Sequence, residues 1–169
     1  ETLYEAVKTI DWAAHIGDEA SMAVDFLGSN REINNTQFGA QKVKDAVVDQ
    51  LRDSRGRRPQ VDADNPDVRV NVYLHRDNAS ISIDLSGSSL HRRGYRTEQG
   101  QASLKETLAA AILLRADWPA IAAAGGSLRD PLCGSGTLQI EAALMAADIA
   151  PGLLRQHYGF QGWLQHDPK

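Results

Sequence analysis

Eight residues, Asp130–Thr137, constrain the fold more than any other part of this sequence, and they read D-P-L-C-G-S-G-T. The run Ser127–Arg129 before them can form a strand, and the apolar run Leu138–Ala147 after them predicts a helix. Two glycines at alternate positions let a ligand lie against the main chain, because no Cβ is in the way. A helix that begins at such a turn offers free N–H groups and the positive end of its dipole. We therefore expect a strand, a glycine loop and a helix that together bind a cofactor.

Several kinds of glycine loop are candidates. A phosphate-binding P-loop needs Lys after its last glycine, but Thr137 follows Gly136. A dinucleotide-binding loop needs a third glycine, but Gln139 stands at that position. A plain strand-to-helix turn, in which Asp130 and Thr137 only cap the helix, is the simplest alternative. The octapeptide as a whole resembles the first motif of the S-adenosylmethionine-dependent methyltransferases that modify exocyclic amino groups of nucleic-acid bases.

The chemistry of the loop suits that cofactor. Asp130 can accept from the α-ammonium group, the backbone of Gly134–Gly136 can pass under the methionine and ribose portions, and the N–H groups around Thr137 can meet the carboxylate. The predicted cofactor-binding residues are Asp130, Pro131, Cys133, Gly134, Ser135, Gly136 and Thr137. Cys133, with no His at a fixed short spacing, is expected to pack at the loop rather than to act as a nucleophile.

The first half of the chain alternates between helical and strand patterns. Helices are predicted over Thr2–Trp12 and Phe38–Arg52, where apolar residues recur three and four apart. A half-buried strand is predicted over Ala20–Phe26, where apolar and polar residues alternate. The runs Val68–Leu74 and Ile81–Leu85 also alternate and are joined by a short polar link, so they predict an antiparallel hairpin.

The second half predicts helices around the glycine loop. Ser103 and Glu106 have capping-box spacing before an amphipathic helix that ends near Trp118. Glu141, on the helix after the loop, is expected to form a salt bridge or a cap. The fold class is therefore α/β: an α+β module with an antiparallel hairpin and a long helix, followed by the first strand–loop–helix of a Rossmann-like domain.

Composition excludes several classes of function. The net charge is −4, so RNA contacts must come from local basic patches rather than from overall charge. One cysteine allows no disulfide within the chain, and His15, His75, His157 and His166 lack ligand spacing, so no metal site is predicted. No apolar run reaches membrane-spanning length and no signal peptide is visible, so we expect a cytoplasmic protein without a membrane partner.

Two basic clusters are candidates for contact with RNA. Arginine offers phosphate two parallel hydrogen bonds, and a neighbouring aromatic ring can stack on an unpaired base. The first cluster could equally complement the dipole at the end of the long helix, and the second could instead make an interdomain contact. The candidate residues are Arg52, Arg55, Arg57 and Arg58 in the first cluster, and His91, Arg92, Arg93, Tyr95 and Arg96 in the second.

Several segments resemble one family of enzymes. Residues Ser21–Arg96 look like a THUMP domain, most closely in Asp84–Gly87 and Leu90–Arg96, and Lys105–Leu113 resembles the helix that precedes the methyltransferase loop. The order of these parts resembles the bacterial ribosomal RNA large-subunit methyltransferase K/L family. The resemblance implies RNA binding by residues 1–98 and the beginning of a methyltransferase domain over residues 99–169. It implies methyl transfer from S-adenosylmethionine to the N2 amino group of a guanine in large-subunit ribosomal RNA.

The sequence departs from that family at its catalytic motif. No N-P-P-Y or D-P-P-Y tetrapeptide is present, and no acid after a second strand is available to hold the ribose. We expect a fragment truncated at both ends, with the rest of its methyltransferase domain missing, that binds RNA at most and binds S-adenosylmethionine weakly or not at all. The alternatives are a non-catalytic THUMP module that binds RNA and a fragment of an adenine-N6 DNA methyltransferase.

Overall fold

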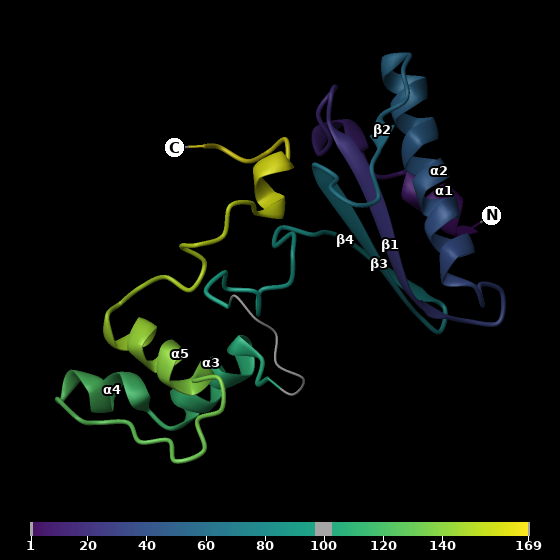
Figure 1. Ribbon diagram of the computed structural model, residues 1–169. Helices are drawn as coiled ribbons and strands as arrows, with labels where there is room; N and C mark the ends of the chain where they lie inside the picture. The colour runs from purple at the N-terminus through teal and green to yellow at the C-terminus, as the bar shows by residue number, and fades with distance from the viewer. Residues whose placement is uncertain (1, 97–102, 169) are drawn as a thin grey trace. The chain divides into compact units, whose positions relative to one another are not determined.

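The computed structural model describes residues 2–96 and 103–168, and the chain divides into two compact units (Figure 1). The first unit comprises the described residues up to Gly87 together with the segment that begins at His157. The second unit comprises the described residues of Ser88–Gln156.

A four-stranded sheet in the order β2-β1-β3-β4 forms the base of the first unit (Figure 1). β1 (Ser21–Ser29) runs parallel to β3 (Val68–His75) and to the short β2 (Gln60–Val61). β4 (Asn78–Ile83) pairs with β3 in the antiparallel direction, which confirms the predicted hairpin. A parallel pair requires a long crossover connection, and the helix between β1 and β2 supplies it.

Two helices and one face of the sheet enclose the core of this unit. α1 (Thr2–Lys8) packs against the 20-residue α2 (Thr36–Arg55), which in turn packs against β1. The side-chain oxygen of Asn35 accepts two N–H groups of the first turn of α2, and Gly56 ends the helix with a left-handed φ of 74°. These two caps explain why α2 extends past both ends of the predicted helix.

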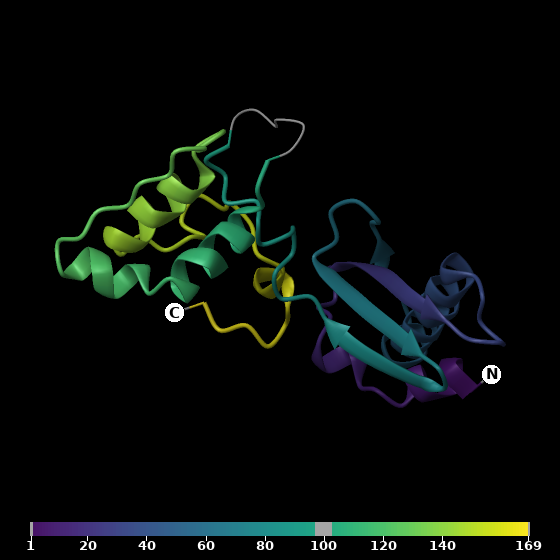
Figure 2. The ribbon, with the colours of Figure 1, turned by 90° about the horizontal axis from the view of Figure 1, so that it is seen from below.

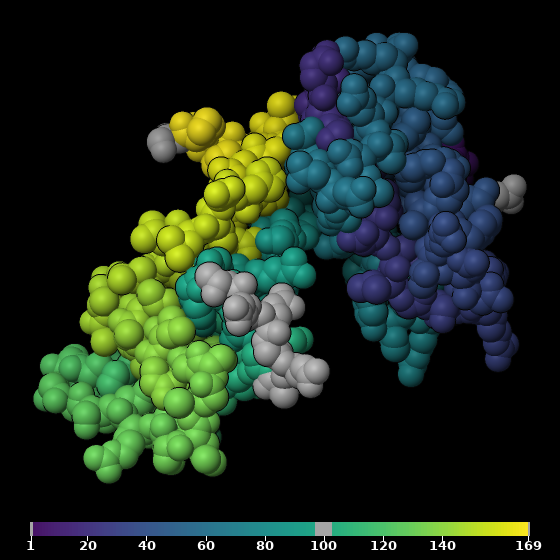
Figure 3. All heavy atoms as spheres, in the orientation of Figure 1, coloured from purple at the N-terminus to yellow at the C-terminus, as the bar shows by residue number. Residues whose placement is uncertain are grey.

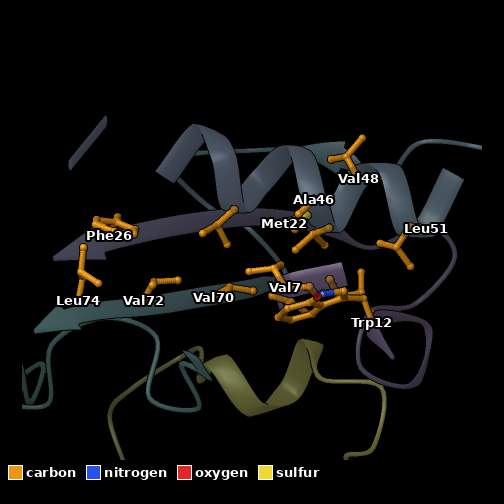
Figure 4. Close-up of a cluster of buried hydrophobic side chains, with 14 residues drawn as sticks. Val7, Trp12, Met22, Phe26, Ala46, Val48, Leu51, Val70, Val72 and Leu74 are labelled. Atoms are coloured by element: carbon orange, nitrogen blue, oxygen red, sulfur yellow. The ribbon is translucent and has the colours of Figure 1, made fainter. Parts of the chain in front are cut away.

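The alternation in β3 places its apolar residues on one face of the sheet. Val70 and Val72 are at most 1% exposed, and they meet Met22 of β1 and residues of α2 in the core (Figure 4). Each fully buried side chain of this kind stabilises the fold by about 1.5–3 kcal/mol. The period of two in the sequence therefore corresponds to a half-buried strand, as predicted.

The first helix is shorter than its sequence pattern suggests. α1 ends at Lys8, and a 3₁₀ turn, η1 (Trp12–Ala14), follows it. The indole Nε1 of Trp12 donates to the carbonyl oxygen of Val7 at 2.9 Å, so the ring turns into the core, where it is 1% exposed. This hydrogen bond and the burial of a large ring outweigh the continuation of the helix.

A second 3₁₀ turn, η2 (Gly159–Gly162), belongs to the first unit although it lies near the end of the sequence (yellow in Figure 2). The N–H of Phe160 donates to the carbonyl oxygen of Leu85 at 3.0 Å. Trp163 Nε1 donates to His15 Nδ1 at 3.0 Å, and the two rings stack. His15 is thus a half-buried partner of an aromatic ring.

Three helices pack together in the described part of the second unit. α3 (Glu106–Arg115), α4 (Trp118–Ala123) and α5 (Thr137–Ala146) pack on one another, and their atoms form one green group in Figure 3. Their small core contains Leu113, Trp118 and Ala142. The indole of Trp118 donates to the carbonyl oxygen of Ala142 at 2.9 Å, which joins α4 to α5.

Three predictions for this unit were wrong in detail. Ser127–Arg129 is not a strand: residues 126–130 have no regular secondary structure, because the described part of this unit offers no strand to pair with. Ser103 does not cap α3, whose N-cap is Lys105 without a side-chain hydrogen bond. Trp118 begins α4 rather than ending a helix, because its ring is drawn into the core.

Candidate cofactor-binding site

The octapeptide folds as two consecutive turns that lead into α5. The carboxylate Oδ1 of Asp130 accepts the N–H of Leu132 at 3.0 Å, and the N–H of Gly136 donates to the carbonyl oxygen of Cys133 at 2.8 Å. The side chain of Asp130 therefore shapes the loop through one of its oxygens. Its other oxygen, Oδ2, can serve as an acceptor for a ligand.

Both glycines of the loop have left-handed backbone conformations. Gly134 has a φ of 53° and Gly136 a φ of 73°, values that L side chains rarely adopt. A Cβ on Gly134 would meet no atom within 4 Å, and one on Gly136 would meet only Gln139 Oε1 at 3.9 Å. The backbone turn requires the glycines, and the space beside them is open to a ligand.

The N-terminus of α5 has no side-chain cap. Its N-cap residue is Gly136, and neither Asp130 nor Thr137 caps the helix, contrary to the plain-turn alternative. The N–H groups of the first turn, from Thr137 to Gln139, lack partners within the helix, because an α-helix bonds each N–H to a carbonyl four residues earlier. Uncapped N–H groups and the positive end of the helix dipole together favour an anionic group at this place.

The remaining residues of the predicted cofactor set lie at the surface. Pro131, Cys133 and Ser135 are exposed, and the hydroxyl of Ser135 lies 3.2 Å from that of Thr137. Cys133 is a free, exposed thiol, so the prediction that it packs at the loop was wrong. Its Sγ lies 3.8 Å from the carbonyl oxygen of the neighbouring Gly134.

Two residues of the second basic cluster bind a buried carboxylate on α5. Glu141 is 2% exposed. The hydroxyl of Tyr95 donates to its Oε1 at 3.0 Å, and Arg93 Nη2 lies 3.5 Å from its Oε2. Burial and the hydrogen bond to Glu141 raise the pKa of Tyr95. The hydroxyl therefore stays protonated at pH values at which an exposed tyrosine would lose its proton. The salt bridge predicted for Glu141 is confirmed.

Arg96 makes the third internal connection of this cluster. Its Nη2 donates to Thr137 Oγ1 at 2.8 Å and to the carbonyl oxygen of Leu104 at 3.2 Å. Its Nε lies 3.3 Å from Glu106 Oε1, and Glu106 is 4% exposed. One guanidinium thus joins the first residue of α3 to the first residue of α5. Glu106, predicted from its spacing to be a capping residue, is instead the carboxylate partner of this arginine.

A cavity of about 390 Å³ lies beside these contacts within the second unit. Its lining includes one acid, Glu106, and five basic residues: His91, Arg92, Arg93, Arg96 and Lys105. Arg92 is exposed. His91 Nδ1 forms a hydrogen bond of 2.7 Å with the hydroxyl oxygen of Ser89. The cavity brings together the residues that the sequence grouped as a cluster, and it adds Lys105, which sequence reasoning did not include.

The first basic cluster lies at the end of α2, where three of its four arginines already have partners. Arg52 pairs with two aspartates of α2 at 2.9 and 3.1 Å. Arg55 donates to two carbonyl oxygens in the segment before β1 at 2.9 and 2.8 Å, and Arg57 pairs with Glu19 at 2.6 Å. Arg58 is exposed and lines a second cavity together with Lys42 and Lys44. RNA contact by this cluster stays a prediction.

Sequence reasoning also missed a buried acceptor next to the loop. The side-chain oxygen of Gln139 is buried, and it has no hydrogen-bond partner within the described structure.

Within the described ranges, 2–96 and 103–168, no group of three or more metal-ligating side chains occurs. No helix in those ranges is long and apolar enough to cross a membrane.

Comparison with known proteins identifies both parts of the chain. A model of the THUMP domain matches residues 1–84, and a model described as RMKL-like, methyltransferase domain, matches residues 93–167. Proteins called ribosomal RNA large subunit methyltransferase K/L from Pseudomonas aeruginosa and Methylococcus capsulatus are 58% and 59% identical over 99% of this chain. The chain belongs to the K/L methyltransferase family. It spans 23% of the length of each of these two relatives.

Solved structures support the same fold for this K/L family member. A predicted N6-adenine-specific DNA methylase from Listeria monocytogenes superposes with a TM-score of 0.77 at 32% identity, over 95% of this chain and 41% of that one. A structure named for the methyltransferase SMU.472, complexed with SAH, superposes with a TM-score of 0.74 at 29% identity, over 98% of this chain and 42% of that one. The predicted α/β fold class and family are therefore confirmed.

Proposed function

We propose that this chain is the RNA-binding and cofactor-loop portion of an S-adenosylmethionine-dependent RNA methyltransferase. The observation that carries the proposal is the open glycine loop at Asp130–Thr137, which leads directly into an uncapped helix N-terminus. The match of residues 93–167 to a methyltransferase domain supports the cofactor, and the match of residues 1–84 to a THUMP domain supports RNA as substrate. When bound, the cofactor supplies an electrophilic methyl group on a sulfonium ion.

The loop residues fit the charged groups of that cofactor. Asp130 offers Oδ2 to the α-ammonium group while its Oδ1 holds the turn. The first-turn N–H groups of α5 bind the carboxylate, which the helix dipole also favours. Gly134 and Gly136 let the nucleoside lie against the backbone, because the space beside them is open. We assign Pro131, Cys133, Ser135 and Thr137 to the wall of the same site.

The exposed arginines of the two clusters and the basic residues near them are the better candidates for RNA phosphate. Arg58 and Arg92 are exposed, and the cavity near Arg92 adds His91 and Lys105. We propose that each of these two basic groups, Arg58 in the first unit and the residues around Arg92 in the second, binds the RNA backbone, since clustered basic side chains bind phosphate. Contact of RNA with the other residues of the two clusters remains a prediction, because their side chains already have partners.

We further propose the guanine N2 amino group of large-subunit ribosomal RNA as the methyl acceptor, and the cytoplasm as the compartment. The names of the K/L relatives support ribosomal RNA. We place the division between the RNA-binding and methyltransferase regions near residue 98, between the two matched segments. We also propose that the 169 residues by themselves transfer no methyl group, because the sequence contains no N-P-P-Y or D-P-P-Y motif to hold the target amine.

The substitution Asp130→Asn tests the cofactor assignment. Asn keeps the side-chain oxygen that accepts the Leu132 N–H and removes the negative charge. A hydrogen bond to a charged group is worth about 1.5–3 kcal/mol, so affinity for S-adenosylhomocysteine should fall about 10- to 100-fold. Calorimetric titration measures the affinity. The protein used should have the full length of the relatives and contain this sequence. The chain of 169 residues should bind more weakly or not at all.

Asp117→Asn is the matched control. Asp117 is exposed in the same unit and has a φ of 57°, a left-handed conformation that Asn tolerates. This variant should bind with unchanged affinity. Equal affinity of Asp130→Asn and the unsubstituted protein would contradict the assignment of the α-ammonium group to Asp130. Failure of the unsubstituted full-length protein to bind would contradict the proposed function itself.

Adenine-N6 methylation is the second candidate, because one similar solved structure carries that description. The THUMP match favours an RNA substrate over DNA. The two activities differ in their product. Ribosomal RNA methylated by the full-length protein is digested to nucleosides and analysed by mass spectrometry. N2-methylguanosine supports our proposal, and N6-methyladenosine supports the alternative.

A further inference from the structure

We infer that Arg96 is a positioning residue that sets the geometry of the glycine loop by holding the first residue of α5. Nothing in the proposed function requires this role, since Arg96 was grouped with the RNA-binding cations by its neighbours in the sequence. The inference about the loop stands on the contacts within residues 88–156. Its consequence for cofactor affinity rests on the proposed function.

The buried polar side chains of the described structure all face one segment. Glu106, Thr137 and Glu141 are 4%, 3% and 2% exposed, and they are the polar side chains counted as buried in the described ranges. Arg96 binds the first two of them, and the residues just before Arg96 in the sequence bind the third. Buried polar groups need partners, so this segment is a structural requirement of both α3 and α5.

The guanidinium of Arg96 fixes two helix ends at once. Through Nη2 it holds Thr137 Oγ1, one residue beyond Gly136, and through Nε it lies against Glu106, the first residue of α3. The same Nη2 also reaches the carbonyl oxygen of Leu104. The planar fork of arginine can span these partners simultaneously, whereas the single ammonium of lysine cannot.

The hold on Thr137 acts where the loop needs support. Gly136 is in a left-handed conformation with no side chain, and no side chain caps α5, so the start of the helix lacks the usual restraint. The first helical hydrogen bond, from the N–H of Ile140 to the carbonyl oxygen of Gly136 at 2.9 Å, lies directly beneath this point. Without Arg96, we expect this bond to open more often and the first-turn N–H groups to lose their common direction.

Amide hydrogen exchange measured by NMR on the 169-residue chain tests the inference. Arg96→Met should increase exchange at Ile140 by about tenfold or more, because local opening becomes easier. Exchange at Val72 of β3 should remain within about twofold, since that residue lies in the other unit. Arg96→Lys should fall between Arg96→Met and the unsubstituted chain. The control is Arg115→Met, which removes an exposed arginine from the last turn of α3 and should leave Ile140 unchanged.

The pattern of exchange decides the outcome. A local increase at the start of α5 supports the inference. Unchanged exchange at Ile140 overturns it. An equal increase at Ile140 and at Leu113 in the core of the unit also overturns it, because Arg96 would then serve only general stability. If Arg96→Met fails to fold, Arg96→Lys and Thr137→Val decide in the same way, since each removes one side of the contact.

A double-mutant cycle isolates the contact itself. In a Thr137→Val background the acceptor that Arg96 binds on α5 is gone, so Arg96→Lys should no longer change the exchange rate of Ile140. Additive effects of the two substitutions would overturn the inference.

Cofactor affinity gives an independent reading. In the full-length protein, Arg96→Lys should weaken S-adenosylhomocysteine binding severalfold, while Arg115→Met should not. Altered exchange with no binding by any form would preserve the positioning role and refute the proposed function. Normal binding by Arg96→Lys together with unchanged exchange would refute the positioning role and preserve the proposed function.

Discussion

Replacement of Glu141 by Leu should strongly destabilise the second unit. The carboxylate of Glu141 is 2% exposed, and it holds the hydroxyl of Tyr95 at 3.0 Å and the guanidinium of Arg93 at 3.5 Å. Leucine leaves an arginine whose side chain is 12% exposed without its counter-charge, and a tyrosine hydroxyl without its acceptor. Removal of one partner of a buried ion pair costs about 3–5 kcal/mol.

Glu141→Gln gives a graded version of the same measurement. Glutamine keeps an oxygen that can accept the hydroxyl of Tyr95 and removes only the charge. We expect a loss of about 1–3 kcal/mol, the value of a hydrogen bond to a charged group. The control Asp148→Asn neutralises an exposed acid just beyond the end of α5, where φ is 53°, and should change stability by less than about 0.5 kcal/mol.

Fluorine NMR of the chain labelled with 5-fluorotryptophan can follow the two units separately. Trp118 lies in the core of the second unit, and Trp12 lies in the core of the first. Urea unfolding curves from the two resonances give two midpoints. Only the Trp118 midpoint should fall in Glu141→Leu, because the first unit contributes nothing to this contact.

The double substitution Arg93→Met with Glu141→Leu tests the physical reason. If the cost arises from an unpaired buried charge, removal of the arginine as well should recover most of the stability, because apolar replacements of a buried pair are often neutral or stabilising. A double variant as unstable as Glu141→Leu alone would refute this reasoning. An unchanged Trp118 midpoint in Glu141→Leu would refute the structural assignment of the pair.

Three further predictions concern both units. Because the pKa of Tyr95 is raised in the fold, the unfolded chain loses the hydroxyl proton near pH 10 while the folded chain keeps it. The urea midpoint reported by Trp118 should therefore fall as the pH rises above about 10, and it should fall less in Tyr95→Phe. The backbone N–H and hydroxyl of Ser21 donate to Asp67 and lower the pKa of its carboxyl. The stabilisation that Trp12 reports is therefore present above about pH 4 and is lost below it. Asp67→Asn should flatten this pH dependence and lower the free energy of unfolding at pH 7 by about 0.5–1 kcal/mol. Leu51→Ala, at a position 1% exposed in α2, should cost about 2–5 kcal/mol by the Trp12 midpoint and leave Trp118 unchanged; equal shifts at both tryptophans would contradict independent units.

Local patterns in the sequence determined much of the first unit. The hairpin of β3 and β4 follows from alternation, because successive side chains of a strand point to opposite faces. The long helix α2 follows from its apolar stripe, with ends that Asn35 and Gly56 fix. The parallel pairing of β1 with β3 was not predictable in this way, because partners such as Val24 and Val70 are distant in the sequence and are joined only by the tertiary fold.

The sequence also located the glycine loop, since only glycine readily adopts the left-handed turns at Gly134 and Gly136. It did not reveal that residues 127–129 lack strand structure. A strand is stabilised by neighbouring strands, and a local pattern contains no information about them.

The tertiary structure alone decided what the second basic cluster does. In the sequence, Arg93, Tyr95 and Arg96 form a run of cations and an aromatic ring typical of an RNA contact. In the fold, two acids from different helices, Glu106 and Glu141, meet that run and bind it. A charge pattern shows which groups can bind an anion, but burial and distance determine which anion they bind, and both depend on how distant segments pack.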